Sequence, residues 1–395
     1  MQYNLKIMVV AGEASGDLHA AKLVRALRAS APDVEFEFFG AAGGHLRSAK
    51  VEPIVKSDNF SVVGLPEIAR AIPMFLGAFR ELKKAAVARK ADAAILVDFP
   101  DFNLRLAKSL KKSGITVVYY ISPQLWAWRE YRIEIIRKYV DLLITILPFE
   151  KNWYAARGVS NVEYVGSPLA REVHPTMSKE EFCRENDLNL SKPIVSLLPG
   201  SRHKEITRIL PEMLRTAGIM LGRQREIQFV IALASVRKES EVQDAFQTVK
   251  DEFPGLASRI KTIAGKTYDV LNSSDAAAIT SGTATMEAGF IGTPMVIVYK
   301  TSAINYKLLR PLISVEHFGL VNLVAGKRVA TEMIQDEFSP LALADDLFRL
   351  LEPKHNASMR AEIKSAADKL GHGGASAKAA DLIINLLEQK NSVSK

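Results

Sequence analysis

The sequence lacks the features that mark several large classes of protein. It contains one cysteine, Cys183, among its 395 residues. An internal disulfide and a Cys-x-x-Cys redox or zinc motif are therefore excluded, and a reducing compartment fits. No apolar run approaches the roughly 20 residues that a membrane span requires. The first 17 residues hold one lysine and a short apolar run, which predicts a strand and not a signal peptide. We expect a cytosolic protein that can still lie on a membrane face.

Motifs for metal, nucleic-acid and serine chemistry are also missing. The seven histidines are scattered, and Asp98 and Asp101 have the wrong spacing for an Asp-x-Asp motif, so we expect neither a metal nor another cofactor. The absence of a G-x-S-x-G elbow disfavours a serine hydrolase. The net charge of +8 indicates an anionic partner, which could be nucleic acid, a phosphorylated metabolite or a membrane surface. Without a dense basic tract that carries aromatics, nucleic acid is the least favoured of these.

What the sequence does contain is a regular alternation of strand-like and helix-like segments. Its length and its 48% apolar content predict two globular domains. Repeated β-α units favour parallel sheets, so we predict an α/β fold of two Rossmann-like domains that face a central cleft, residues 1–170 and 171–395. The last helices, about 355–395, have three alternatives: their own domain, the first domain or a partner chain. The predicted strands are 5–11, 34–40, 95–99, 115–121, 142–149, 193–201, 227–234, 275–280 and 294–300.

Two loops of the second half suit a nucleotide diphosphate, because ligands of such sheets bind outside the carboxyl ends of the strands. In 197–206, the backbone N–H groups of Gly200 and Ser201 can approach an anion, and Arg202 adds donors suited to phosphate. The alternative is an ordinary turn with a surface arginine.

The second loop, in 278–300, is the stronger indication of a nucleotide site. Residues Ser281, Gly282 and Thr283 separate a strand from a short helix whose N-terminus can hold a phosphate. Glu287, one turn later, cannot bind phosphate but can accept hydrogen bonds from ribose hydroxyls. The alternative is a solvated helix glutamate.

The loop after the first strand, "GEASGD", lacks a phosphate-binding pattern. Glu13 and Asp17 would repel a diphosphate, so this loop is better suited to hydroxyl groups. Ser15 can either cap the following helix or contact a ligand, and both alternatives stay open.

Two aspartates follow the apolar run 93–97. We predict that Asp101 caps the next helix, because aspartate is a favoured N-cap. Asp98 has no such structural task at the end of its strand, and a carboxylate there can take a proton from an incoming hydroxyl. The alternative for Asp98 is a structural hydrogen bond within the turn.

Residues 65–90 combine large apolar side chains with flanking lysines and arginines, which suits an anionic membrane surface. Pro73 and Gly77 disfavour one long regular helix, and the alternative is an amphipathic helix on the core. Trp126 and Trp128 could stack on a sugar or line an acyl site, but packing is favoured. The predicted membrane and acyl-chain patch is Ile68, Ile72, Met74, Phe75, Leu76 and Phe79, and its basic flank is Arg70, Arg80, Lys83, Lys84, Arg89 and Lys90.

Seven segments in order resemble the lipid-A-disaccharide synthase family. They are "AGEASGD" (11–17), "DFPDFN" (98–103), "SPQLWAWR" (122–129), "LPFEKNWY" (147–154), "LLPGSR" (197–202), "SGTATMEA" (281–288) and "NLVAGKRV" (322–329). The resemblance implies the GT-B fold and a metal-independent, inverting transfer. UDP-2,3-diacylglucosamine would give its sugar to lipid X (2,3-diacylglucosamine 1-phosphate), forming a β-1,6-linked disaccharide 1-phosphate and UDP. The implied setting is the cytoplasmic face of the inner membrane of a Gram-negative bacterium.

The resemblance also implies roles for single residues. Asp98 would be the general base, and Glu287 would hold the ribose. Glu13 and Ser15 would line the acceptor side, and Asn322 would lie in the cleft. Two departures stand out: "GAAGGHLRS" replaces the usual residues after the second strand, and Val321 replaces a proline.

Other functions stay open at this point. One is a different UDP-sugar enzyme of the same fold, such as a peptidoglycan glycosyltransferase or an epimerase. Another is a non-catalytic adaptor that senses nucleotides at a membrane. A homodimer, the commonest assembly of soluble proteins, is also open.

Overall fold

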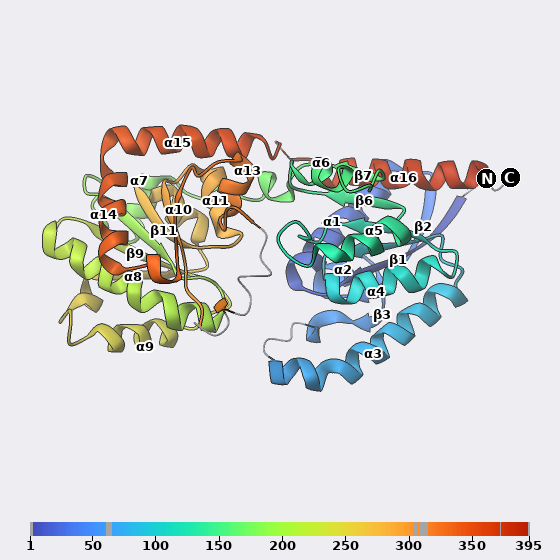
Figure 1. Ribbon diagram of the computed structural model, residues 1–395, viewed down its shortest axis with the longest axis horizontal. Coiled ribbons are helices and arrows are strands. Elements are labelled where there is room, and N and C mark those ends of the chain that lie inside the picture. Colours follow the sequence, from blue (N-terminus) through green and yellow to red (C-terminus); the bar gives the residue numbers. More distant parts are fainter. Residues whose placement is uncertain (1–2, 61–64, 303–305, 308–314, 372, 394–395) are drawn as a thin grey trace. The chain divides into compact units, whose positions relative to one another are not determined.

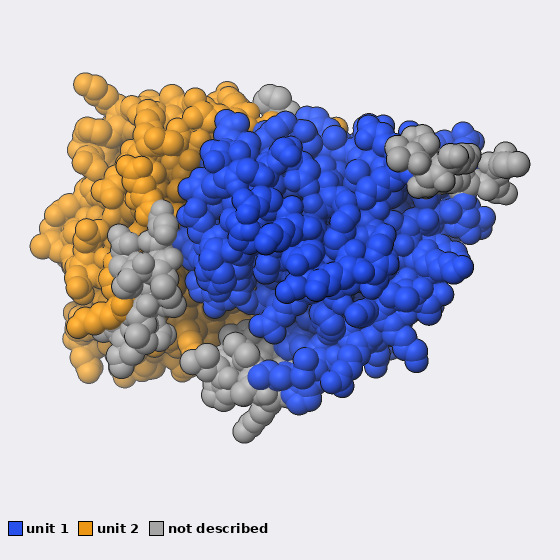
Figure 2. All heavy atoms as spheres, turned by 45° about the vertical axis from the view of Figure 1, so that its right-hand side comes forward, with its two compact units in different colours: residues 1–168, 372–395 blue, residues 169–371 orange. Residues whose placement is uncertain are grey.

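All strand pairings in the described part of the chain are parallel, and they form two separate sheets. The structure is a computed structural model that describes residues 3–60, 65–302, 306–307, 315–371 and 373–393. Two compact units contain one sheet each, and Figure 2 shows the atoms of the two units in different colours. Unit 1 is residues 1–168 with 372–395, and unit 2 is residues 169–371.

The sheet of unit 1 has seven strands in the order β3-β2-β1-β4-β5-β6-β7. The order reverses between β1 and β4, which makes this the switch point where such sheets bind ligands. Every residue of β4 and β5 is buried, as expected for parallel strands covered on both faces. The strands are β1 (Tyr3–Ala11), β2 (Val34–Ala42), β3 (Glu52–Lys56), β4 (Ala93–Val97), β5 (Thr116–Tyr120), β6 (Leu142–Thr145) and β7 (Val162–Tyr164).

Helices cover both faces of this sheet (Figure 1). On one face lie α1 (Ala14–Ser30), α2 (Gly44–Ser48) and α16 (Ala375–Val393). On the other lie α3 (Leu65–Ala88), α4 (Pro100–Lys111) and α5 (Ile133–Tyr139). Helix α6 (Glu150–Ala155) follows β6. The α16 helix packs against α1, so the end of the chain is part of unit 1.

The sheet of unit 2 has six strands in the order β10-β9-β8-β11-β12-β13, with its switch point between β8 and β11. Helices α8, α9 and α14 share one hydrophobic core with the strands, while α10 and α11 contact β8, β9 and β11. The strands are β8 (Ile194–Leu198), β9 (Gln228–Leu233), β10 (Ile260–Ala264), β11 (Ala276–Thr280), β12 (Met295–Tyr299) and β13 (Thr331–Ile334). The helices are α7 (Lys179–Glu185), α8 (His203–Arg223), α9 (Glu239–Val249), α10 (Thr267–Ser273), α11 (Ala284–Ile291), α13 (Leu320–Ala325), α14 (Pro340–Leu351) and α15 (Pro353–Asp368).

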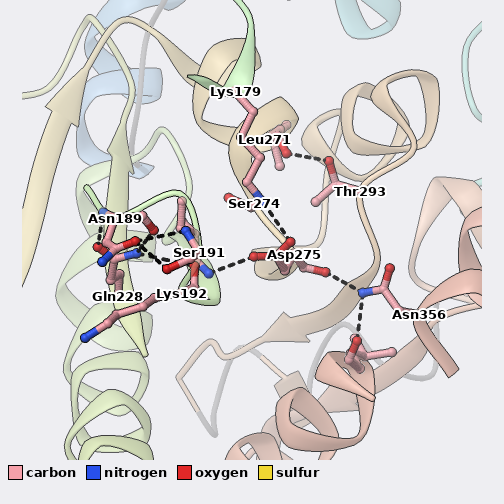
Figure 3. Close-up of polar contacts among 12 residues, drawn as sticks. Lys179, Asn189, Ser191, Lys192, Gln228, Leu271, Ser274, Asp275, Thr293 and Asn356 are labelled. Atoms are coloured by element: carbon pink, nitrogen blue, oxygen red, sulfur yellow. Dashed lines mark hydrogen bonds and ion pairs between the residues drawn. The ribbon is translucent and has the colours of Figure 1, made fainter. Parts of the chain in front are cut away.

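Asp275 joins several of these elements at the amino end of β11 (Figure 3). Its carboxylate accepts a hydrogen bond from the backbone N–H of Ile194 at 2.9 Å and forms an ion pair with Lys179 of α7 at 2.8 Å. Its carbonyl accepts a hydrogen bond from Asn356 of α15 at 2.7 Å. These contacts hold α7 and α15 to the amino ends of β8 and β11, and the two predicted loops lie at the opposite, carboxyl ends of these strands.

The predicted fold class of two parallel Rossmann-like domains is confirmed, and two details were wrong. Strands β3, β7, β10 and β13 were not predicted, because they are short strands at or near the sheet edges with little apolar pattern. Residues 65–88 form one helix despite Pro73 and Gly77. Pro73 lies on the exposed face, where water can replace the one backbone hydrogen bond that proline removes. Among the described residues, none of the helices has the length and apolarity to cross a bilayer.

Candidate active site

Asp98 lies at the switch point of the first sheet, directly after β4. Its backbone has φ 47° and that of Phe99 has φ 52°, so two consecutive non-glycine residues adopt the left-handed conformation. The backbone carbonyl of Asp98 accepts hydrogen bonds from the Tyr119 hydroxyl at 2.7 Å and the Asn103 amide at 2.8 Å. Backbone strain of this kind persists only where the surroundings hold it, and it is common at functional sites. Tyr119 and Asn103 therefore hold the backbone of Asp98 in this conformation.

The carboxyl group of Asp98 has an unusual affinity for protons. Burial raises its pKa to about 6, and the negative charge of Glu13 adds to this shift. Glu13 comes from the loop after β1, the other strand of the switch point, and its side chain is exposed. Gly12 makes this approach of the two loops feasible, since a Cβ there would lie 2.3 Å from the Phe99 ring. Asp98 thus has the pKa of a base that can exchange protons near neutral pH.

Asp101 and Asp17 have tasks that differ from the predicted ones, and of the two interpretations of Ser15 the helix cap is excluded. The N-cap of α4 is Phe99, and Asp101 lies in the first turn, where it forms ion pairs with Arg129 and Arg132. Proline at the first helical position already suits the helix start, so no side-chain cap is needed there. Asp17 is buried and accepts hydrogen bonds from the backbone N–H groups of residues 43 and 45, both at 2.8 Å. Ser15 lies inside the first turn of α1, whose N-cap is Glu13, so it does not cap the helix, and it is exposed.

The carboxyl ends of four strands in unit 2 surround a pocket of about 550 Å³. These strands are β8, β9, β10 and β11, which flank the switch point of that sheet. The pocket is lined by all seven residues that the sequence predicted for UDP: Gly200, Ser201, Arg202, Ser281, Gly282, Thr283 and Glu287. The structure therefore brings the two predicted loops together at one site.

One part of this site is already occupied by a side chain of the protein. The carboxylate of Glu205, in the first turn of α8, accepts hydrogen bonds from the backbone N–H groups of Ser201 and Arg202, each at 3.1 Å. Gly200 has φ 103°, and a Cβ there would lie 2.4 Å from the same carboxylate. The expectation that the N–H group of Ser201 is free for phosphate was wrong, because a glutamate three residues after the N-cap reaches back to the helix start.

Glu205 also orients Arg202. Its carboxylate holds the guanidinium at 2.9 Å, and the side chain of Arg202 remains 74% exposed while that of Glu205 is 13% exposed. An arginine that is anchored at one end and open to the pocket keeps donors for an anion.

The start of α11 and Glu287 form the opposite wall. The Ser281 hydroxyl donates a hydrogen bond to the Phe318 carbonyl at 2.7 Å, while Thr283, the N-cap, is exposed. Glu287 is half-buried and not a solvated helix residue. Burial raises the pKa of its carboxyl group, and a hydrogen bond from Tyr268 opposes that shift. Tyr268 was not identified from the sequence, although it follows the unpredicted strand β10 at the same sheet edge.

Asn322 does not offer its amide to a ligand. It is fully buried, and its amide group accepts hydrogen bonds from the N–H groups of Val329 and Ala330 and donates to Glu332 and to a backbone carbonyl, at 2.8–2.9 Å. The expectation that it faces a cleft was therefore wrong. Glu332 in turn accepts hydrogen bonds from the N–H group of Phe318, whose carbonyl binds Ser281. Asn322 thus supports the loop that holds Ser281.

The apolar side chains of α3 divide between two environments. Ile72, Met74 and Leu76 are exposed. Phe75 and Phe79 instead turn inward, to Phe102 of α4 at ring-centroid distances of 6.2 and 6.1 Å. The side chains of Ile68 and Arg70 lie outside the described residues. Of the predicted basic flank, Arg80, Lys83, Lys84 and Lys90 are exposed, whereas Arg89 is held in ion pairs with Glu37 and Glu52.

The two tryptophans of "SPQLWAWR" also differ. Trp126 is buried, and its indole N–H donates to the carboxylate of Glu150 at 3.0 Å. Glu150 is fully buried, and this burial raises its pKa to about 7. Trp128 is exposed, with the guanidinium of Arg129 3.9 Å from its ring centroid. Trp126 therefore has the packing role that the sequence favoured, whereas Trp128 lies at the surface.

Comparison with known proteins identifies the family. A model of the lipid-A-disaccharide synthetase family matches residues 7–384. The chain belongs to this family. It is 42% identical over 386 residues to a lipid-A-disaccharide synthase of Syntrophus aciditrophicus, covering 98% of each chain. It is 40% identical over 383 residues to that of Myxococcus xanthus, covering 97% of each.

The family makes the chain a glycosyltransferase of lipid A biosynthesis, and the resemblance read from the seven segments is confirmed. Solved structures of similar fold include a UDP-GlcNAc 2-epimerase from Neisseria meningitidis bound to UDP-GlcNAc, with a TM-score of 0.65 and 13% identity over 96% of this chain and 100% of that one. A sucrose-phosphate synthase from Thermosynechococcus elongatus has a TM-score of 0.58 and 14% identity over 100% of both chains. At these identities the likeness concerns the fold alone.

Proposed function

We propose that the chain transfers 2,3-diacylglucosamine from UDP to the 6-hydroxyl of lipid X, with inversion at the anomeric carbon. The observation that carries this proposal is Asp98, a half-buried carboxyl group at a sheet switch point whose pKa is raised to about 6 by its partial burial. In its ionised form it can take the proton of the acceptor hydroxyl as that oxygen attacks. Unit 1 would bind the acceptor, with Glu13 near Asp98 and Ser15 exposed in the first turn of α1.

Unit 2 would bind the nucleotide. Its pocket has Arg202 and the start of α11 for the diphosphate, which gathers negative charge as it leaves. Glu287 would accept hydrogen bonds from the ribose. No step of this account requires a metal or another cofactor.

The experiment that tests this function measures release of UDP in detergent micelles with EDTA present. We expect turnover only when both UDP-2,3-diacylglucosamine and lipid X are supplied. Turnover of UDP-N-acetylglucosamine without an acylated sugar would instead favour an epimerase or another transferase. UDP binding without any turnover would favour the adaptor.

The rate should depend on pH through Asp98. Because the base must be ionised and burial raises its pKa to about 6, log kcat/KM should rise with pH and level off above about 6. Glu13→Gln removes the negative charge that helps to keep the proton on Asp98, so the rise should move to lower pH. An unchanged midpoint in Glu13→Gln would show that another group controls the acid side of the profile.

We further propose that α3 contacts the anionic face of the inner membrane. Replacing Ile72, Met74 and Leu76 with serine should lower the fraction of protein that sediments with liposomes containing anionic lipid, because these side chains are exposed and would insert. The unfolding temperature should stay the same. The matched control replaces the exposed Leu190, Val236 and Leu341 of unit 2 with serine, and equal losses in both variants would contradict this proposal.

A further inference from the structure

Two arginines of unit 1 converge on one aspartate at the same sheet edge as Asp98. After β5, Arg129 is the N-cap and Arg132 the last residue of a short 3-10 turn, Glu130–Arg132, while Asp101 lies in the first turn of α4, which follows β4. Arg129 contacts Asp101 at 2.9 Å, and Arg132 contacts the same carboxylate oxygen. β4 and β5 are neighbours in the sheet. The cluster therefore contains two positive charges and one negative charge, three residues from the proposed base.

The burial of the three side chains is uneven. The side chain of Arg132 is 13% exposed, whereas that of Asp101 is 64% exposed. An ion pair with so exposed a carboxylate contributes little free energy, so the arginines can form hydrogen bonds with another anion at small cost. Arg129 also has φ 57°, a strained conformation for arginine that places its guanidinium over Trp128.

The surroundings place this cluster near the proposed reaction. Burial and then the charge of Asp98 raise the pKa of Tyr119, and the guanidinium of Arg132 opposes this effect. Tyr119, whose hydroxyl donates to the Asp98 carbonyl, therefore lies within electrostatic reach of both groups. Trp128 and Tyr131 are exposed beside the cluster, and exposed aromatic rings are suited to cover the face of a sugar.

We infer that Arg129 and Arg132 bind the 1-phosphate of the acceptor sugar. This inference rests on the proposed function. In a glucosamine ring C1 and C5 flank the ring oxygen, and C5 carries C6, so an acceptor whose 6-hydroxyl meets Asp98 places its 1-phosphate near that base, where the cluster at Asp101 also lies. Planar guanidinium groups are suited to a phosphate, because they can donate two parallel hydrogen bonds. The pair would also make the enzyme select a phosphorylated acceptor over a neutral one.

The test compares lipid X with the same diacylglucosamine that carries a free 1-hydroxyl, in nonionic micelles without anionic lipid. The readout is the ratio of kcat/KM for the two acceptors, measured in the full chain. We expect the wild type to prefer lipid X and Arg132→Ala to reduce this preference about 10- to 100-fold, the range for lost hydrogen bonds to a charged group. Arg132→Lys keeps the charge without the planar fork, so it should retain part of the preference.

Arg89→Ala is the matched control. Arg89 also pairs with a carboxylate, at 2.6 Å, and lies over an aromatic ring, at 4.7 Å, but it precedes β4 at the opposite edge of the sheet. The Arg89→Ala variant should prefer lipid X as strongly as the wild type does. A ratio that stays at the wild-type value in Arg132→Ala would overturn the inference and leave the proposed function intact. Equal losses with both acceptors would also overturn it, because they would indicate a structural role.

Two further measurements separate the remaining outcomes. Binding of glucosamine 1-phosphate, followed by NMR without any donor, should weaken in Arg132→Ala. This result decides the inference even if the wild type shows no turnover, an outcome that would contradict only the proposed function. If Arg132→Ala instead weakens sedimentation with anionic liposomes and keeps the acceptor preference, the arginines bind lipid headgroups and the inference fails.

Discussion

Asp98→Asn should lower the rate of UDP release about 10²- to 10⁴-fold, the usual cost of removing a general base. Asparagine is the sharper substitution because residue 98 has φ 47°, and asparagine tolerates this conformation better than alanine does. Affinity for UDP should remain, since the predicted nucleotide site belongs to unit 2. The measurement is single-turnover release of UDP from UDP-2,3-diacylglucosamine with lipid X.

The matched control for this variant is Asp92→Asn. Asp92 precedes the same strand at its other end, where its carboxylate accepts a hydrogen bond from the backbone N–H of Lys6 at 2.8 Å. We expect a rate within about twofold of the wild type, in keeping with a residue remote from the chemistry. If Asp98→Asn also keeps the wild-type rate, Asp98 is a turn residue, and the base must be sought elsewhere.

Arg202→Ala should lower kcat about 10²- to 10³-fold, the usual effect of removing one donor that stabilises developing negative charge. Its guanidinium is exposed at the proposed nucleotide pocket and held by Glu205. The fold should persist, because the backbone N–H groups of residues 201 and 202 still donate to Glu205. Stopped-flow release of UDP and a thermal unfolding curve measure the two expectations.

Arg223→Ala controls for the loss of a positive charge from the same helix. Arg223 lies at the other end of α8, where it pairs with Asp345 at 2.5 Å. Its removal should leave kcat unchanged. A similar loss in both variants would show that the overall charge of unit 2, and not a contact with the leaving group, controls the rate.

Some features could be predicted from the sequence because they depend on local pattern. The apolar run of β4 and the glycine turn after β8 predict strands that end at a sheet edge. Ligands of parallel sheets bind outside the carboxyl ends of the strands, so the loops that follow these strands are the candidate binding loops. That reasoning placed all the predicted UDP residues on one pocket. It works because parallel strands align their carboxyl ends.

Other features depend on partners far along the chain. Whether Asn322 faces a ligand or the core is decided by Glu332 and the strand that carries it, and no local pattern reveals this. Whether Phe75 is exposed is decided by Phe102, 27 positions away in the sequence. Glu205 is a different case, because a glutamate three residues after a helix N-cap is a readable signal. The hydrogen bonds of Glu205 to the backbone N–H groups of residues 201 and 202 could therefore have been predicted.

The central claim is tested most directly by the structure of the product. We predict that incubation with UDP-2,3-diacylglucosamine and lipid X yields a disaccharide 1-phosphate whose new bond is β and joins C1 of the donor to O6 of the acceptor, as determined by NMR. The yield of disaccharide should equal that of UDP. An α bond, a different linkage position or release of UDP without any disaccharide would contradict the account.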